Sequence, residues 1–204
     1  MDSVLSILSL IGVAVFAASG ALVANEERFD LIGALFLSGV AGLGGGTIVD
    51  LLIGADMVRW VRDPAPLWIA LGAGAAVFML ARFTRMPHQT LLWADAVGLA
   101  VFTATGMERL TALPIRPEVA VFLTTILASG GGILRDVLAN RTPIVFSPET
   151  ELYVTAAFAG GAAYLITQAF APEAALPAAL IVTLAIRSAA MIFGWRLIRG
   201  RGRD

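Results

Sequence analysis

Seven long apolar stretches constrain the fold of this chain more than any other feature. They cover residues 4–25, 31–53, 67–83, 91–107, 119–138, 152–170 and 174–197, and short polar or proline-containing segments separate them. The hydrocarbon core of a bilayer is about 30 Å thick, and a helix of about 20 apolar residues crosses it. The sequence therefore predicts an all-α integral membrane protein with seven transmembrane helices, and residues 1–204 form a single membrane domain.

The composition excludes several other classes of protein. The chain has 204 residues, of which 58% are hydrophobic and 14% charged, whereas about a quarter of a soluble domain is charged. A formal net charge of -1 argues against a nucleic-acid partner held by phosphate neutralisation. With no cysteine, disulfides and thiolate catalysis are excluded. Because no hydrolytic or phosphate-binding motif is present, we expect no enzyme, no cofactor and no metal site, with membrane lipids as the surroundings.

The arginines predict an orientation in the membrane. Four lie in segments on the side of the N-terminus, and eight lie in the opposite loops and the C-terminal tail. Cytoplasmic segments are enriched in Lys and Arg. The sequence thus predicts a multi-pass protein with its N-terminus outside and its C-terminus in the cytoplasm.

The sequence repeats itself at an offset of 86 residues without a gap. Residues 12–20 align with 98–106, residues 44–46 with 130–132, and Asp50 with Asp136. The two copies, 1–85 and 86–171, each hold three of the predicted helices, and residues 172–204 add a seventh helix and a basic tail. An odd number of crossings inverts the second copy relative to the first. Inverted repeats are typical of transporters and some channels, in which the functional path lies where the repeats meet.

A glycine triplet interrupts the middle of the second and the fifth apolar stretch, at residues 44–46 and 130–132. Each glycine inside a helix costs about 1 kcal/mol relative to alanine. The triplets therefore predict a kink or an unwound turn in both helices. Exposed backbone groups at such a turn would line a wet cavity and favour a cation. The alternative interpretation is close helix packing, because small residues let two backbones approach.

Five charged residues lie deep within the apolar stretches: Asp50, Asp95, Arg135, Asp136 and Arg187. A charge at the centre of a bilayer costs roughly 2.5–3.5 kcal/mol, so such residues usually face a partner or a water-filled path. These charges could therefore line a pore, or pair with one another to hold the bundle together, and both roles can coexist.

The segments Gly-Gly-Gly-Thr-Ile-Val-Asp at 44–50 and Gly-Gly-Gly-Ile-Leu-Arg-Asp-Val-Leu at 130–138 resemble the bacterial branch of the trimeric intracellular cation (TRIC) channel family. Segments 60–64, 95–102 and 151–153 are similar to the same family, some of whose members are described as glycine transporters. The resemblance implies a homotrimer of seven-helix protomers, each with its own pore for potassium and other monovalent cations. Relatives often carry Arg before Asp in both copies, whereas here Val49 corresponds to Arg135.

We therefore predict a cation channel of a bacterial inner membrane. The candidate ion-path residues are Gly44, Gly45, Gly46, Thr47, Asp50, Ser129, Gly130, Gly131, Gly132, Arg135 and Asp136, supported by Asp95 and Arg187. Backbone groups at the glycines would replace part of the hydration shell of the ion. Two alternatives stay open: a transporter for glycine or a similar zwitterion that uses the same site, and a purely structural membrane protein.

Overall fold

The computed structural model describes residues 2–84, 88–147 and 152–195 of the chain. The basic tail beyond residue 195 lies outside the described residues. In the part that is described, every regular element is helical. The elements are α1 (Asp2–Glu26), α2 (Leu31–Leu52), α3 (Arg59–Arg62), α4 (Ala65–Ala81), α5 (His88–Thr111), α6 (Pro117–Leu138), the 3-10 turn η1 (Ile144–Phe146), α7 (Tyr153–Phe170) and α8 (Pro172–Phe193).

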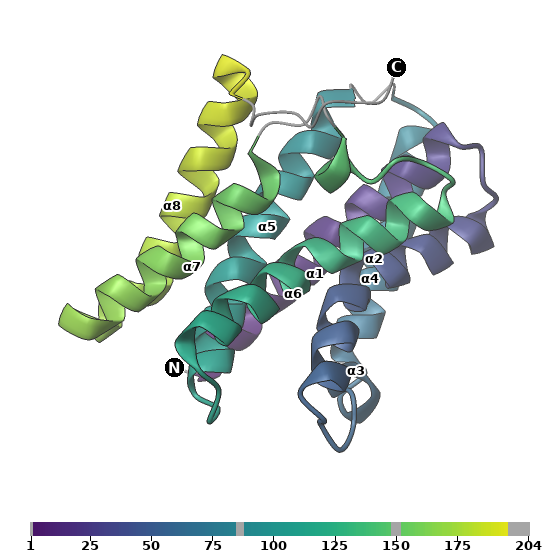
Figure 1. Ribbon diagram of the computed structural model, residues 1–204. Coiled ribbons are helices and arrows are strands. Elements are labelled where there is room, and N and C mark those ends of the chain that lie inside the picture. The colour runs from purple at the N-terminus through teal and green to yellow at the C-terminus, as the bar shows by residue number, and fades with distance from the viewer. Residues whose placement is uncertain (1, 85–87, 148–151, 196–204) are drawn as a thin grey trace, which may run out of the picture.

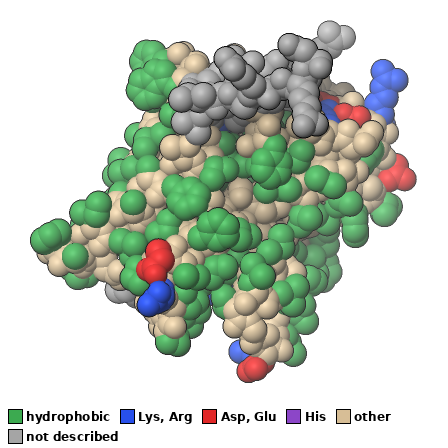
Figure 2. All heavy atoms as spheres, viewed as in Figure 1, with side chains coloured by type: hydrophobic (Ala, Val, Ile, Leu, Met, Phe, Trp, Pro, Cys, Tyr) green, Lys and Arg blue, Asp and Glu red, His purple; other side chains and the backbone are tan. Residues whose placement is uncertain are grey.

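The helices have the length and the surface of a membrane protein. Five of them, α1, α2, α5, α6 and α8, are long and apolar enough to cross a bilayer, and α4 is a shorter apolar helix of 17 residues. Large apolar side chains point outward, including Phe36, Phe83 and Ile166. Figure 2 shows apolar side chains over most of one face, with the charged ones gathered toward the top and bottom of the view. The chain is an all-helical membrane protein.

Local signals in the sequence set several of the helix ends. The carboxylate of Asp30 accepts a hydrogen bond of 2.7 Å from the amide of Gly33 and caps the start of α2. Prolines in the first turn begin α4, α6 and α8. The helices α2 and α6 are followed by residues with positive φ, Gly54 at 67° and Asn140 at 56°. Gly54 and Asn140 are 86 residues apart, so the two helices end in the same way.

Helix packing divides the long helices into two groups of three. The helices α1, α2 and α4 contact one another, as do α5, α6 and α7. The groups meet where α1 packs on α5 and α2 packs on α6, and α8 lies against α5 and α7 at one side of the molecule (Figure 1).

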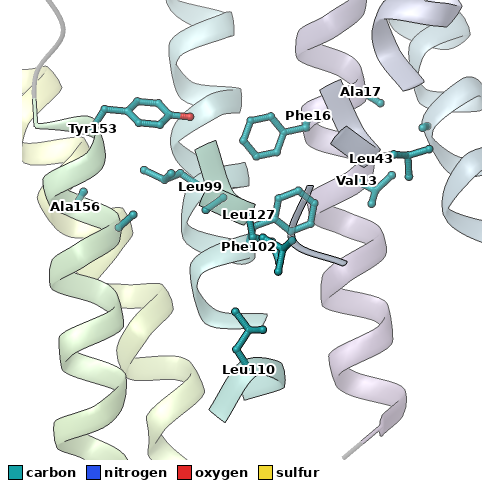
Figure 3. Packing of buried hydrophobic residues seen from close by; sticks show 14 of the residues in the cluster. Val13, Phe16, Ala17, Leu43, Leu99, Phe102, Leu110, Leu127, Tyr153 and Ala156 are labelled. Atoms are coloured by element: carbon teal, nitrogen blue, oxygen red, sulfur yellow. The ribbon is translucent and has the colours of Figure 1, made fainter. Parts of the chain in front are cut away.

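The contacts between the two groups are also related by the 86-residue offset. The Phe16 ring stacks on that of Phe102, with ring centroids 5.4 Å apart and an interplanar angle of 9°. A Cβ atom at Gly12 would lie 2.7 Å from the Phe102 ring, and one at Gly98 would lie 2.6 Å from the Phe16 ring. Figure 3 shows the two phenylalanines at the centre of the apolar core. Because residue 12 lies beside 102 and residue 16 beside 98, α1 and α5 run antiparallel.

Candidate functional site

The glycine triplets lie where α2 crosses α6. A Cβ atom at Gly45 would collide with the carbonyl oxygen of Leu127, and one at Gly131 would collide with that of Ala41. These contacts are again related by the offset of 86, and they show that α2 and α6 cross in antiparallel directions. Glycine is required at Gly45 and Gly131 because each backbone touches the backbone of the facing helix.

Both helices continue without interruption through their triplets, from Leu31 to Leu52 and from Pro117 to Leu138. The predicted unwound turn is therefore wrong, and the alternative of close helix packing is what these residues do. Packing against a facing backbone compensates for the low helix propensity of glycine, so the helical hydrogen bonds stay intact. A bend of either helix axis stays a prediction.

A cavity of about 530 Å³ opens beside this crossing, on the side of the molecule where α3 lies. We call it the α3 cavity. Its walls come from α1, α2, α5 and the segment around α3, and they include Gly46, Asp50, Arg59, Thr105 and Arg109. Phe102 and Leu127 also line it, so the cavity extends to the apolar core between the two helix groups.

Asp50 is a buried carboxylate of this cavity, and two arginines bind it. Its side chain is 1% exposed. Arg59 donates to Asp50 Oδ2 from its backbone amide at 3.0 Å and from Nε at 3.4 Å, and Nη2 of Arg109 donates to Asp50 Oδ1. Partial burial and the neighbouring Arg109 lower the pKa of the Arg59 guanidinium, while Asp50 opposes the shift. Two cations therefore share one buried carboxylate.

The short helix α3 is attached to α2 by a second contact. The indole Nε1 of Trp60 donates to Thr47 Oγ1 at 2.9 Å, and the Thr47 hydroxyl donates to the carbonyl of Leu43. A Cβ atom at Gly46 would have Arg59 Nη2 as its neighbour, at 3.4 Å. The Arg59 head group thus lies over the last glycine of the first triplet, inside the mouth of the cavity.

A second ionic cluster surrounds Arg135, whose side chain is 0% exposed. Arg135 donates to both oxygens of Asp95 at 2.7 and 3.1 Å, to Asp136 Oδ1 at 2.8 Å and to Ser19 Oγ at 2.7 Å. Asp136 Oδ2 accepts the amide of Ile144 at 3.0 Å. We call Arg135, Asp95, Asp136 and Ser19 the Arg135 cluster. Such a bidentate, fully paired arrangement is what keeps a guanidinium stable without water.

The Arg135 cluster meets the stacked rings of Phe16 and Phe102, here called the aromatic pair, at Gly132. A Cβ atom there would lie 3.7 Å from the Phe16 ring, 3.8 Å from Arg135 Nη2 and 3.8 Å from the Tyr153 hydroxyl. The buried guanidinium of Arg187 lies over the Tyr153 ring, 5.1 Å from its centroid. Figure 3 shows Tyr153 extending from α7 toward Phe16.

Comparison with known proteins identifies the family. The family model described as "Glycine transporter" matches residues 6–82 and 92–169, and its second segment begins 86 residues after the first. The chain is 40% identical to the UPF0126 inner membrane protein YadS of Escherichia coli K12, over an alignment of 188 residues that covers 90% of each chain. It is 40% identical over 185 residues to a UPF0126 membrane protein of Deinococcus radiodurans, covering 88% of this chain and 84% of the relative.

Solved structures that are similar to this chain identify the family further. The TRIC trimeric intracellular cation channel orthologue from Rhodobacter sphaeroides is 37% identical with a TM-score of 0.89, over 94% of this chain and 99% of that chain. The chain belongs to the bacterial TRIC family. A second TRIC cation channel structure is 33% identical with a TM-score of 0.85, over 98% of both chains.

The residues predicted for the ion path of this TRIC chain lie in three places. Gly44, Gly45, Gly130 and Gly131 are at the helix crossing, and Gly46 and Asp50 line the α3 cavity. Thr47 lies on α2 and accepts a hydrogen bond from Trp60 of α3. Gly132, Arg135 and Asp136 are at the Arg135 cluster with Asp95. Ser129 donates to the carbonyl of Thr125 at 2.7 Å, within its own helix. Asp50 and Asp136 are not brought together, because each lies at the end of its own antiparallel helix.

Four residues of the candidate site were not predicted from the sequence: Arg59, Arg109, Phe16 and Phe102. In the sequence, both arginines fall in segments that set the orientation in the membrane, and both phenylalanines fall in the repeat at residues 12–20 and 98–106. One sequence signal could have found the arginines. Arg135 precedes Asp136 in the second copy of the repeat, whereas Val49 precedes Asp50 in the first, so Asp50 has no adjacent countercharge. A buried carboxylate without an adjacent arginine requires a cation from elsewhere in the fold.

Proposed function

We propose that this TRIC chain is a cation channel of a bacterial inner membrane, permeable to potassium and other monovalent cations. The observation that carries the proposal is the α3 cavity, which extends from the α3 side past Asp50 to Phe102 in the core. The two solved relatives named as TRIC cation channels support it. The proposal includes seven spans in two inverted repeats, with one pore per protomer of a homotrimer, the N-terminus outside and the C-terminus in the cytoplasm.

The proposed ion path has three parts along one line of contacts. A cation enters the α3 cavity beside Asp50, passes the stacked rings of Phe16 and Phe102, and reaches the Arg135 cluster. Asp50 raises the local concentration of cations, and the aromatic pair is the apolar constriction. Arg59 lies over Gly46 and the two rings are in contact, which supports a proposed path that is closed in this conformation.

Recording from the purified protein in planar bilayers under a potassium gradient tests this proposal. We expect discrete single-channel events that reverse at the potassium potential. Reversal at the anion potential, or a well-folded protein that gives no events, would contradict it.

Replacing Phe102 with alanine is expected to raise the single-channel conductance. The change removes one of the two rings from the constriction, so the apolar barrier to a hydrated ion falls, and we expect the conductance to roughly double. Phe122→Ala is the matched control, because Phe122 is 56% exposed and contacts Phe158 on the outer surface. Equal conductance in the two variants would show that the ring of Phe102 does not limit the flow of ions.

Neutralising Arg59 is expected to increase the potassium current at low voltage. Arg59→Gln removes a positive charge from the mouth of the cavity, while Arg109 keeps Asp50 paired. A cation entering the cavity then meets a lower electrostatic barrier. Arg116→Gln is the control, because Arg116 is 84% exposed and pairs with Glu118 on the surface. A current in Arg59→Gln no larger than in the control would exclude Arg59 as a barrier.

A transporter of glycine or a similar zwitterion is the second candidate, because the matched family model is described as "Glycine transporter". A cavity open toward one side and closed at Phe102 is also what alternating access requires. Uptake of glycine into proteoliposomes that saturates at carrier-like rates, without discrete conductance, would favour this candidate. Glycine uptake absent from vesicles that conduct potassium would exclude it.

A further inference from the structure

The α3 cavity carries more positive than negative charge. Its charged lining residues in the described part of the chain are Asp50, Asp63, Arg59, Arg62 and Arg109. Asp63 is exposed and accepts the amide of Ala65 at 3.1 Å. Three arginines therefore face two carboxylates, which leaves one positive charge without a counterion in a cavity proposed to admit cations.

Arg109 also has a donor that no described residue accepts. Its Nη2 donates to Asp50, whereas its Nη1 is buried with no hydrogen-bond partner among the described residues. A guanidinium has five N–H donors and no acceptor, and a buried donor left unpaired costs about 1–3 kcal/mol. Arg59 cannot supply the missing acceptor, because it too is a cation held on Asp50. The described lining of the cavity thus provides no acceptor for this donor.

We propose that the α3 cavity binds a small oxyanion, a carboxylate or a phosphate group, between Arg59 and Arg109. Guanidinium groups match the planar, two-oxygen edge of a carboxylate and the oxygens of a phosphate. The cavity of about 530 Å³ exceeds the size of either group, and glycine at position 46 leaves the space beside Arg59 Nη2 open. Free anions and the head group of an anionic lipid present the same chemistry to these arginines.

The bound oxyanion would neutralise the surplus charge of the cavity. It would accept hydrogen bonds from Arg59 and Arg109 and separate two guanidiniums that repel each other. This site does not depend on the channel proposal, because its test measures binding to the folded protein rather than current.

Thermal unfolding of the detergent-purified protein tests the site. Inorganic phosphate and acetate are titrated at constant potassium concentration and ionic strength, and the midpoint temperature (Tm) is recorded, since a ligand that binds the folded state raises Tm saturably. We expect a saturable rise in the unmodified chain and about tenfold weaker binding in Arg109→Gln. Arg116→Gln, on the surface of the same side, keeps the full rise. A rise of equal size in all three proteins, or no saturable rise in the unmodified chain, would overturn the proposal.

A second variant and a titration in lipid nanodiscs make the test decisive. Should Arg109→Gln not fold, Arg59→Gln replaces it, because Asp50 keeps its bond to Arg109 there. The titration is repeated in nanodiscs of phosphatidylcholine with and without phosphatidylglycerol. A Tm gain from phosphatidylglycerol that is lost in Arg59→Gln would identify a lipid head group as the oxyanion, and a gain from phosphate alone would identify a free anion. The absence of both gains would contradict an oxyanion site.

Discussion

Gly45→Ala is expected to lower the fraction of folded protein strongly. The new methyl group would collide with the carbonyl oxygen of Leu127, which belongs to the backbone of α6 and cannot rotate away. Either the two helices separate or the backbone of α6 distorts, and we expect a loss of about 3 kcal/mol, at the upper end of typical overpacking. The measurements are Tm and the fraction of monodisperse protein after size-exclusion chromatography.

Gly39→Ala is the matched control in the same helix. A Cβ atom at Gly39 would have no neighbour within 4 Å, so this change removes a glycine from α2 without a collision. We expect Tm to stay the same or rise, because alanine is favoured over glycine in a helix by about 1 kcal/mol. Gly131→Ala repeats the test from the other side, where the methyl group would meet the carbonyl oxygen of Ala41. Equal Tm values for Gly45→Ala and Gly39→Ala would disprove the backbone contact.

The glycine triplets show where sequence reasoning could choose only between two outcomes. A run of three glycines predicts an unwound turn if the helix stands alone, and a close crossing if another helix covers it. The choice depends on whether residue 45 faces residue 127, and the sequence of α2 does not contain that contact. The internal offset did contain part of the answer, because it aligns Gly45 with Gly131 and Ala41 with Leu127.

The sequence predicts which charged residues are buried, but it does not predict which residues they pair with. Each of the five costs too much to face lipid, so partners or water were expected, and Arg135 does pair with Asp95 and Asp136. The partners of Asp50 come from the short helix α3 and from the last turn of α5. The hydroxyls of Ser19 and Thr105 donate to the carbonyls of Phe16 and Val101 within their own helices. Ser19 in addition accepts from Arg135, a contact between distant helices that local spacing does not encode.

Arg135→Gln is expected to be the most destabilising change to a charged residue in this chain. It leaves Asp95 and Asp136, 1% and 2% exposed, without their shared cation. Removing one partner of a buried ion pair costs about 3–5 kcal/mol. We expect a correspondingly large fall in Tm, measured in detergent with the same protocol as for the glycine variants.

Two further variants separate charge from packing at this site. Asp95→Asn added to Arg135→Gln removes one uncompensated carboxylate, so the double variant should be more stable than Arg135→Gln alone, although it has one more substitution. Arg141→Gln is the control, because Arg141 pairs with Glu26 and Glu27 at the end of α1 in a partly exposed cluster, where ion pairs contribute about 0–1 kcal/mol. If the double variant were less stable than Arg135→Gln, the guanidinium would act through its shape and its bond to Ser19 rather than through its charge. The Arg135 cluster would then stabilise the fold by packing. Cation selectivity along the proposed path would have to come from other residues.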